Sequence, residues 1–415
     1  MRRGRGVAVV VAASCLAVAC CGCRTASSSG VRPELEVSKT EAWVRPPEIE
    51  SVEGTGPAMT MREYRLPGGC SLKGYDSRFA VFYDRSISAL DDSPIRLLDL
   101  ETGKHAQVRS QAVGTAEGFA IIGLRCSDEW VVWEELKGNE QEAPLKCYWR
   151  LFAAPILKDG MSLGEPVLVD ENEVSIASRP LFAVVGDEVF WMTNSSANTV
   201  QEGAVDGARV RAKVLPDGAM REVLSSTRHI RTLSASEGHL LVSEYVAGKG
   251  AAERLLVVDP ASGASEMTYD LGNVDRPVSH FPVTHEGAVT WAVLPDPEGV
   301  WCDLLYRPAD GAAGTVEDHA GDPVMVGPYV FYETERPEST GIGMTKPVVR
   351  IRGFDPRTGV RFTVLETSAE VDGQWRLPIA QAYDTGSFLI MNDLSFKTEE
   401  SPDTTLVRRY TLTSK

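Results

Sequence analysis

Short apolar runs, each bounded by polar residues or by a turn that contains glycine, recur along the chain from residue 59 onward. The strongest runs combine β-branched and aromatic residues, which favours β-strands. Seven copies occur: RFAVFYD (78–84), EWVVWEE (129–135), DEVFWMT (187–193), HLLVSEY (239–245), AVTWAVL (288–294), YVFYETE (329–335) and SFLIMND (387–393). No long segment repeats apolar residues at the helical period of 3.6, so the pattern predicts an all-β protein with little helix.

Tight turns that contain glycine recur between these runs. The six turns are DLETG ending at Gly103, LKDG at Gly160, LPDG at Gly218, DPASG at Gly263, PADG at Gly311 and DPRTG at Gly359. Asp, Ser or Thr caps such a turn, and glycine accepts the positive φ that the bend needs. A weaker strand precedes each strong run, which makes a repeating unit of four strands over roughly 40–58 residues.

Four-stranded units at this period predict a β-propeller, and seven strong runs predict seven blades, with six or eight as the alternatives. The last unit lacks its fourth strand, while an orphan strand, MTMREYRL (59–66), stands before the first unit. We expect this strand to complete the last blade, which would close the ring and leave no unpaired edge there. The strong strands would be buried on both faces, and their tryptophans would be core residues: Trp130, Trp133, Trp191 and Trp291.

The N-terminus has the pattern of an export signal. Three arginines lie within the first five residues, and a run of small apolar residues follows over 7–19. A membrane-spanning helix needs about 20 apolar residues, so this run is too short to span. A charged start, a short apolar run and small residues before a cut site are typical of a secretory signal peptide.

The apolar run ends in AVAC (17–20), which resembles the lipobox of bacterial lipoproteins. In that motif, small residues precede a cysteine that is diacylated and becomes the new N-terminus. The resemblance implies lipidation at Cys20. Cys23, at the end of CCGC, is the second choice of site, and a plain secretory signal is the alternative.

These features predict three parts: a lipoprotein signal peptide (1–19), a flexible tether (20–58) and the propeller (59–415). The tether is rich in Ser, Pro, Glu and Thr and has little to bury. Acyl chains such as palmitate contribute about 0.8 kcal/mol per buried methylene. We therefore expect a lipid anchor to hold the protein at the extracytoplasmic face of the cell membrane.

The charge of the chain limits its partners. The net charge is −16, and removal of Arg2, Arg3 and Arg5 with the signal would make it about −19. The sequence pI is about 5.0, which argues against nucleic acid, because a nucleic-acid partner needs a basic surface. It also argues against binding of anionic lipid by the folded part. Solubility of an exported protein and a basic partner are the two remaining interpretations.

Cysteine and histidine spacing predicts no metal site. The folded part has four cysteines, Cys70, Cys126, Cys147 and Cys302, and none has the spacing of metal ligands. Export permits disulfides, but buried thiols are equally compatible with the sequence. The six histidines are scattered: His105, His229, His239, His280, His285 and His319.

The turns LLDLETGK (97–104) and VVDPASGA (257–264) resemble those of bacterial propellers of the quinoprotein-like and TolB-like superfamilies, which include lipoproteins that act as envelope scaffolds. The resemblance covers Met59–Lys415 and implies a propeller without assigned chemistry. The quinoprotein docking motif carries a tryptophan after TGK. Because TGKHAQV (102–108) has none, we infer no quinone cofactor, and no other cofactor is implied.

A predicted site lies where the strong strands end. Asp84, Glu134, Glu244 and Glu333 occupy equivalent positions in four units, so ring geometry should place them around one face. Three arginines stand just before the weaker first strands, near the same face: Arg179, Arg276 and Arg376. The loops beside them vary in length, and function usually lies on such loops. We expect a mainly acidic face that binds a ligand or partner; the alternative is a solvated rim of arginine–carboxylate pairs.

Two functions are compatible with these features. The first is a lipid-anchored module or scaffold that binds a protein or a cell-envelope ligand without chemistry. The alternative is an extracellular glycan hydrolase or lyase built on a propeller. No nucleophile with its base and no marked acid–base pair appears in the sequence, which favours the binding module. A glycosidase needs two carboxylates about 5–10 Å apart, and a ring of acids supplies such pairs by accident.

Overall fold

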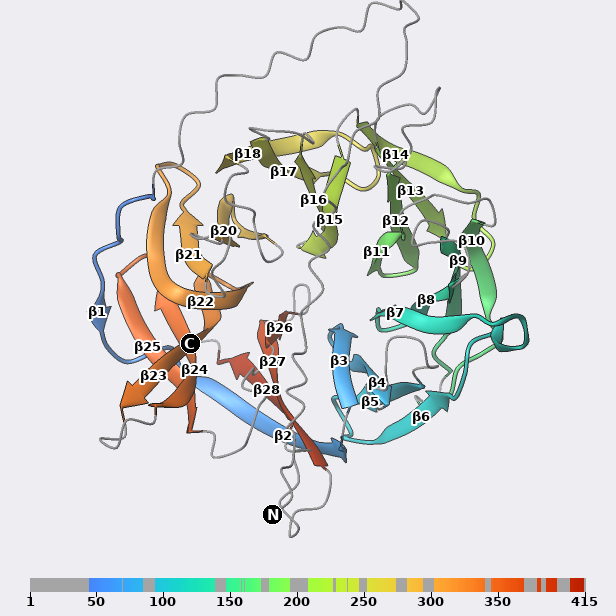
Figure 1. Ribbon diagram of the computed structural model, residues 1–415, viewed down its shortest axis with the longest axis horizontal. Helices are drawn as coiled ribbons and strands as arrows, with labels where there is room; N and C mark the ends of the chain where they lie inside the picture. The colour runs from blue at the N-terminus through green and yellow to red at the C-terminus, as the bar shows by residue number, and fades with distance from the viewer. Residues whose placement is uncertain are drawn as a thin grey trace, which may run out of the picture. The chain divides into compact units, whose positions relative to one another are not determined.

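A computed structural model describes most of the chain beyond residue 44 (Figure 1). The chain divides into two units, residues 1–38 and 39–415, and every described residue belongs to the second. The described residues are 45–68, 70–84, 94–138, 147–157, 159, 161–172, 179–194, 208–226, 229–236, 238–245, 252–273, 282–293, 302–339, 345–368, 379–381, 386–393 and 404–413.

The described residues form β-strands and one short 3₁₀ helix, η1 (Thr115–Glu117). Four sheets each hold four consecutive strands. The first has β3 (Cys70–Tyr75), β4 (Phe79–Asp84), β5 (Ile95–Asp99) and β6 (His105–Arg109). The second has β7 (Ala120–Cys126), β8 (Trp130–Gly138), β9 (Cys147–Pro155) and β10 (Val167–Asn172). The third has β11 (Leu181–Val185), β12 (Glu188–Asn194), β13 (Ala208–Val214) and β14 (Arg221–Ser226). The fourth has β15 (His229–Ser236), β16 (His239–Tyr245), β17 (Ala252–Val258) and β18 (Ser265–Asn273).

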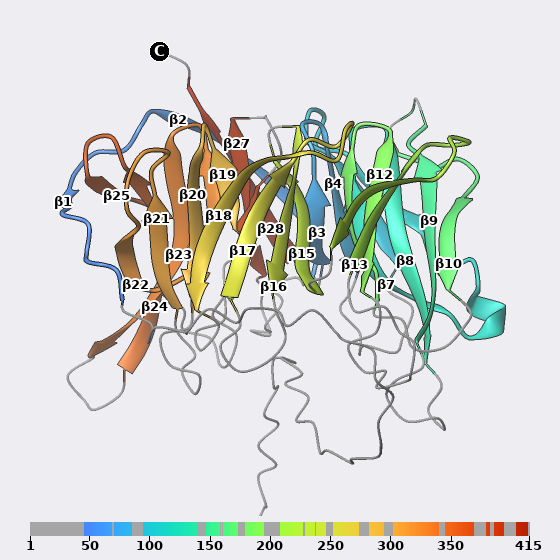
Figure 2. The same cartoon turned by 90° about the horizontal axis from the view of Figure 1, so that it is seen from above.

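An eight-stranded sheet follows, and it consists of two groups of strands that share β22 (Gly314–Val326). The N-terminal half of β22 pairs with β21, and its C-terminal half pairs with β23, with a register shift after Gly321. The other strands are β19 (Val283–His285), β20 (Ala288–Val293), β21 (Cys302–Arg307), β23 (Tyr329–Ser339), β24 (Thr345–Asp355), β25 (Val360–Ser368) and β1 (Val52–Glu53). The hairpin of β23 and β24 extends beyond the neighbouring strands (Figure 2).

The last sheet joins the two ends of the described chain. It holds β26 (Ile379–Gln381), β27 (Ser387–Asp393), β28 (Thr404–Leu412) and β2 (Met59–Pro67). β2 pairs antiparallel with β28, from Met59 opposite Leu412 to Pro67 opposite Thr404. The orphan strand of the sequence therefore supplies the fourth strand of this sheet.

The sheets follow one another around a common centre, which is the arrangement of a β-propeller (Figure 1). The first strand of each group contacts the first strand of the next: β3 with β7, β7 with β11, β11 with β15, β15 with β19, β19 with β22, β22 with β26, and β26 with β3. All pairings within the sheets are antiparallel, apart from the short parallel pairing of β1 with β25.

The core lies between neighbouring sheets. In β4, Phe79 and Val81 pack with Trp133 of the next sheet, while Ala80 and Phe82 pack on the opposite side against the last sheet. Burial of a large apolar side chain stabilises the fold by about 1.5–3 kcal/mol relative to exposure. The second strand of a group is therefore apolar on both faces, as expected, and the predicted core tryptophans are buried: Trp130, Trp133, Trp191 and Trp291.

The turns between third and fourth strands repeat one hydrogen-bonding pattern. Gly103, Gly263 and Gly359 have φ of 75°, 71° and 71°. The amide of each donates to the carbonyl of an aspartate four residues earlier, at 2.8 Å. Gly218 makes the same bond to Val214 without a positive φ, and Gly160 lies outside the described residues. The predicted capping by aspartate is also present, because Asp99 Oδ1 accepts from two amides of its own turn.

The segment 45–58, which the sequence assigns to a flexible tether (20–58), instead lies hydrogen-bonded along the edge of the eight-stranded sheet. We call residues 45–58 the strap. Its first residue, Arg45, donates two hydrogen bonds to Asp303, at 2.8 and 3.2 Å. The rest of the predicted tether, residues 20–44, and the predicted lipidation sites lie outside the described residues.

Backbone hydrogen bonds hold the remainder of the strap. Thr315 of β22 donates its amide to Pro47 and accepts from Ile49, both at 2.8 Å. The amides of Val52 and Gly54 donate to carbonyls at the start of β25, at 3.0 and 2.9 Å. A Cβ at Gly54 would lie 2.8 Å from a methyl carbon on β25, so the strap docks closely there because it carries glycine.

Three cysteines are buried, and no disulfide joins them to one another: Cys70, Cys126 and Cys302. The side chain of Cys147 is outside the described part.

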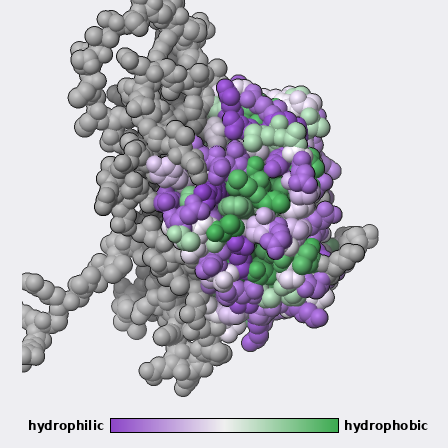
Figure 3. Space-filling view, turned by 90° about the vertical axis from the view of Figure 1, so that its right-hand side faces the viewer, coloured by the Kyte–Doolittle hydropathy of each residue, from purple (hydrophilic) through white to green (hydrophobic). Residues whose placement is uncertain are grey.

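Among the described residues, no helix is long and apolar enough to cross a membrane. The face that carries β9 and β10 mixes apolar and polar side chains (Figure 3); Leu157 and Leu168 belong to this region and are 44% and 41% exposed.

Candidate functional site

The first strands of the first three sheets bring charged and aromatic side chains together. Lys73 lies on β3, Arg125 lies on β7, and Arg179 precedes β11 by two residues. Because β3 contacts β7 and β7 contacts β11, these residues come from adjacent elements. We define the inner-strand cluster as Lys73, Tyr83, Arg125, Glu134, Arg179 and Phe182.

Lys73 is the extra residue of a β-bulge, because the register of β3 on β4 passes from Leu72 to Gly74. A bulge re-aims the side chain that it leaves out of the ladder. The Lys73 ammonium lies 4.8 Å from the centre of the Tyr83 ring, within cation–π distance. Within the described part of the chain it has no hydrogen bond or ion pair. Burial, and next the charge of Arg125, lower the pKa of Lys73.

Arg125 brings a second positive charge beside Lys73. One guanidinium nitrogen donates to the carbonyl oxygens of Lys73 and Leu124, at 2.9 and 2.8 Å. The guanidinium carbon lies 5.8 Å from the centre of the Phe182 ring. No carboxylate of the described residues pairs with Arg125. Its charge is therefore held in place by neutral groups.

Glu134 supplies the one carboxylate of the cluster. Its residue is 1% exposed, and Arg179 donates two hydrogen bonds to it, at 3.1 and 2.9 Å. Burial raises the pKa of Glu134, and the bonds and charge of Arg179 oppose this rise. The pair joins the second sheet to the entry of the third, so it fixes the position of Arg179.

Gly123 on β7 lets these groups approach one another. A Cβ at this position would lie 2.8 Å from a Glu134 carboxylate oxygen and 2.9 Å from a ring carbon of Phe182. Contacts this short are not tolerated by real side chains. A glycine is therefore required where the Glu134 carboxylate and the Phe182 ring meet the backbone of β7.

Tyr83 remains uncharged in this environment. Burial is the main cause that raises the pKa of Tyr83, the charge of Glu134 adds to it, and the charges of Arg125 and Arg179 oppose it. The cluster thus holds three cationic side chains against one carboxylate. In a protein with a net charge of −16, two of these cations, Lys73 and Arg125, have no carboxylate partner among the described residues. Groups with perturbed pKa values that gather in this way mark candidate functional sites.

The four acids predicted from the sequence are all buried. Asp84 pairs with Arg96 of the adjacent strand at 2.6 Å and accepts a bond from the Cys70 thiol at 3.6 Å. Glu244 pairs with Arg254 of its own sheet and accepts from Ser226 of the preceding sheet at 2.7 Å. These carboxylates therefore do not form an open acidic surface; the burial of each demands a partner, and arginine supplies it.

Glu333 is also buried, with 7% of its surface exposed. Of the three predicted arginines, Arg179 meets Glu134 as described above. Arg276 and Arg376 lie outside the described residues, as do most of the variable loops that follow the strong strands. The structure thus brings one predicted arginine to one predicted acid and leaves the other two arginines without a description.

The sequence did not single out Lys73, Tyr83, Arg125 or Phe182. Lys73, Arg125 and Phe182 lie in weaker first strands, Tyr83 lies inside the strong run 78–84, and no motif marks them. One pattern was available: the first strands of two consecutive units, CSLKGY and AIIGLRC, each carry a single basic residue inside an otherwise apolar or neutral segment. No group of three or more potential metal ligands occurs among the described residues.

Comparison with known proteins does not assign a family. The sequence matches no protein-family model, and it matches none of the curated proteins. Several solved structures are similar in fold, with low identity.

One is an oligogalacturonate lyase from Vibrio parahaemolyticus, with 9% identity, a TM-score of 0.48, and coverage of 87% of this chain and 99% of that one. The WD40 domain of SCAP from fission yeast has 10% identity, a TM-score of 0.45, and coverage of 86% and 98%. The β-propeller domain of the Trilobed protease from Pyrococcus furiosus has 15% identity, a TM-score of 0.40, and coverage of 66% and 78%. These neighbours are propeller proteins, and at this similarity they assign no activity to this chain.

Proposed function

We propose that the chain is a seven-bladed propeller that is closed by its two ends. Five sheets have four strands each, and the eight-stranded sheet supplies two further groups joined at β22. The contact of β26 with β3 and the pairing of β2 with β28 support closure. Arg62 and Tyr64 of β2 also donate hydrogen bonds to the turn after β5, at 2.6–3.0 Å, so β2 fastens the last sheet to the first.

We propose that this propeller is a binding module, and that its ligand carries a carboxylate or phosphate group. The observation that carries this proposal is the pair of adjacent cations, Lys73 and Arg125, to which the described residues offer no carboxylate. Holding two like charges together costs free energy, and an oxyanion placed between them would recover it. The sequence suggested an acidic binding face. Three of its four acids, Asp84, Glu134 and Glu244, are paired with arginines, and within the described inner-strand cluster the groups without a carboxylate partner are basic.

The proposed location is the extracytoplasmic face of the cell membrane, with an anionic component of the envelope as the ligand. The lipobox-like AVAC and the preceding apolar run support the anchor. Metabolic labelling with a palmitate analogue tests it: label is expected in the native chain and in Cys23→Ser, and its loss is expected in Cys20→Ser. Labelling of none of the three would show a plain secretory signal instead.

Isothermal titration calorimetry with inorganic phosphate and with citrate tests the binding site. Lys73→Gln and Arg125→Gln are each expected to weaken binding about tenfold or more, because a hydrogen bond to a charged group contributes about 1.5–3 kcal/mol. Arg209→Gln is the matched control. It removes the same charge from a side chain on β13 that is 56% exposed and 3.8 Å from Glu222. Equal affinity in all four proteins would refute the proposed site.

A second function, a glycan hydrolase or lyase, rests on one observation. Burial lowers the pKa of Lys73, and an amine with a lowered pKa is suited to accept a proton as a general base. Turnover of an acidic oligosaccharide that Lys73→Gln abolishes, while substrate still binds to Arg125, would favour this function. Binding without turnover favours the module.

A further inference from the structure

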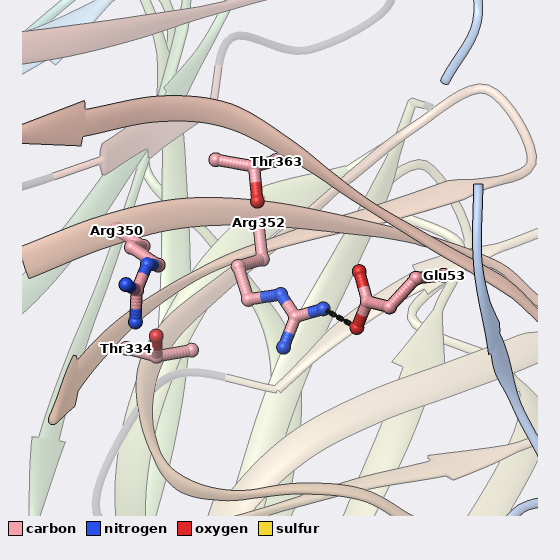
Figure 4. Close-up of a pocket in the computed structure, with 5 residues that line it drawn as sticks. All are labelled: Glu53, Thr334, Arg350, Arg352 and Thr363. Atoms are coloured by element: carbon pink, nitrogen blue, oxygen red, sulfur yellow. Dashed lines mark hydrogen bonds and ion pairs between the residues drawn. The ribbon is translucent and has the colours of Figure 1, made fainter. Parts of the chain in front are cut away.

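A cavity distinct from the inner-strand cluster lies between the strap and the strands β23 to β25. Its volume is about 220 Å³, and its lining residues are Glu53, Thr334, Arg350, Arg352 and Thr363. Arg350, Arg352 and Thr334 surround a common space, and Glu53 approaches Arg352 from β1 (Figure 4). The cavity thus combines cationic groups and hydroxyls with one carboxylate from a separate segment.

Arg352 is the central group of this cavity. Its side chain is 10% exposed, and its Nη1 donates at 3.0 Å to Glu317, whose side chain is 1% exposed. Its Nη2 pairs with Glu53. Its Nε is buried and has no hydrogen-bond partner among the described residues. Glu317 also accepts from Arg361 at 3.5 Å. The buried side of the Arg352 guanidinium is therefore fixed, and on its other side Glu53 is its ion-pair partner among the described residues.

Two threonines add hydroxyl groups beside the arginines. Thr334 is 2% exposed, and its hydroxyl lines the cavity without a partner among the described residues. The Thr363 hydroxyl points toward the same space (Figure 4). Arg350 is held by a 2.7 Å bond from its Nε to Glu366. Guanidinium and hydroxyl donors on several sides of a small cavity are a donor set for an oxyanion.

Glu53 is the least constrained of these groups. Its side chain is 69% exposed, and the strand that carries it, β1, has only two residues. Exposed ion pairs contribute little to stability. Glu53 can therefore leave Arg352 at a small cost, whereas Glu317 cannot.

We propose that this cavity binds a small oxyanion, a carboxylate or a phosphate, which takes the place of Glu53 on Arg352. Three arginines, Arg350, Arg352 and Arg361, here face three carboxylates, Glu53, Glu317 and Glu366. An added anion would leave this group with excess negative charge unless one carboxylate departs. Glu317 is 1% exposed and Glu366 is 54% exposed, whereas Glu53 is 69% exposed and is the carboxylate that pairs with Arg352, so Glu53 is the one that the anion replaces. The strap carboxylate is thus an internal ligand that an external oxyanion displaces.

Titration of inorganic phosphate into a Lys73→Gln/Arg125→Gln background tests this site alone, because that background lacks the cations of the inner-strand cluster. Glu53→Gln is expected to raise phosphate affinity several-fold by removing the competing charge. Thr334→Val is expected to lower it about threefold to tenfold, as for loss of one hydrogen bond. The control is Glu50→Gln, which makes an equal change of charge at an exposed position of the strap. It is expected to leave the phosphate affinity unchanged.

Amide hydrogen exchange gives a second readout. Val52 and Gly54 bond to the start of β25, and their exchange is expected to accelerate when phosphate displaces Glu53. Three outcomes would overturn the proposal: no phosphate binding in the Glu53→Gln protein, equal affinity with and without Glu53→Gln, or full affinity in Thr334→Val. Because each is measured without Lys73 and Arg125, none of them bears on the inner-strand cluster.

Discussion

Replacement of Arg179 by glutamine removes the one cation that pairs with the buried Glu134 among the described residues. The guanidinium donates two hydrogen bonds to that carboxylate, at 3.1 and 2.9 Å. Breaking a fully buried pair by removing one partner costs about 3–5 kcal/mol. The Arg179 side chain is 49% exposed, so water will occupy its place and screen the remaining charge. We therefore expect Arg179→Gln to lower the free energy of unfolding by about 2–3 kcal/mol at pH 7.

This loss should depend on pH. Burial raises the pKa of Glu134 and Arg179 opposes the rise, so the substitution will raise this pKa further. An acid whose pKa is higher in the folded state binds more protons when the protein is folded. The free energy of unfolding therefore falls as pH rises from the pKa of the unfolded state, about 4.3, through the pKa of the folded state. The difference in the free energy of unfolding between the variant and the native protein should be small below about pH 4. It should grow as pH rises through the pKa of Glu134 in the folded state.

Urea unfolding followed by tryptophan fluorescence, with both proteins at pH 7 and at pH 4, measures this difference. The double variant Glu134→Gln/Arg179→Gln removes the buried charge and is expected to regain much of the lost stability at pH 7. A loss that is equal at the two pH values would refute the reasoning. A double variant no more stable than Arg179→Gln would do the same.

Other changes test the closure and the turns. Tyr64→Phe removes a buried hydroxyl that donates to the Leu100 carbonyl at 2.6 Å. Thermal unfolding should show a loss of about 1 kcal/mol in the free energy of unfolding, and an unchanged midpoint would mean that this bond does not stabilise the contact of β2 with the first sheet. Gly263→Ala places a Cβ onto the Val223 carbonyl oxygen at a φ of 71°, whereas Gly386→Ala meets nothing within 4 Å at a φ of 59°. Urea unfolding should show a loss of about 1–2 kcal/mol in the free energy of unfolding for Gly386→Ala and a clearly larger loss for Gly263→Ala. Equal losses would contradict the close contact of the Gly263 turn with Val223.

The repeating strands could be predicted because their causes are local. A strand buried on both faces must be apolar at every position, as β4 is with Phe79 to Phe82, and this leaves a continuous apolar run in the sequence. Turns that need a positive φ select glycine, as at Gly103 and Gly359. The count of strands in the last unit then indicated a missing partner, and the pairing of β2 with β28 supplies it.

The strap could not be predicted because its docking uses backbone groups. Val52 is 63% exposed, and the segment shows no alternation of apolar and polar residues that would indicate a strand. Apart from the side-chain pairs of Arg45 with Asp303 and of Glu53 with Arg352, its contacts depend on backbone amides and on the small size of Gly54. Composition alone therefore made residues 45–58 resemble the polar segment that precedes them.

The inner-strand cluster could not be predicted because it depends on distant segments. Lys73 and Arg125 come together through the packing of β3 against β7 and through a bulge, and neither is visible in the sequence. The acids at the ends of the strong strands were identified by position, but the cross-strand partner of each was not. Antiparallel pairing places Glu244 directly opposite Arg254. It places Asp84 two residues beyond Phe82, the residue opposite Arg96, so Asp84 and Arg96 meet as diagonal neighbours.

The docked strap also determines how the protein would bear mechanical load. Any pull transmitted along the chain toward Arg45 would reach the Arg45–Asp303 contact first, then the bonds to Thr315, and then those of Val52 and Gly54. Only after these contacts fail would tension reach β2. β2 holds the two ends of the described chain together by pairing with β28. The strap would therefore detach before force reaches the pairing of β2 with β28.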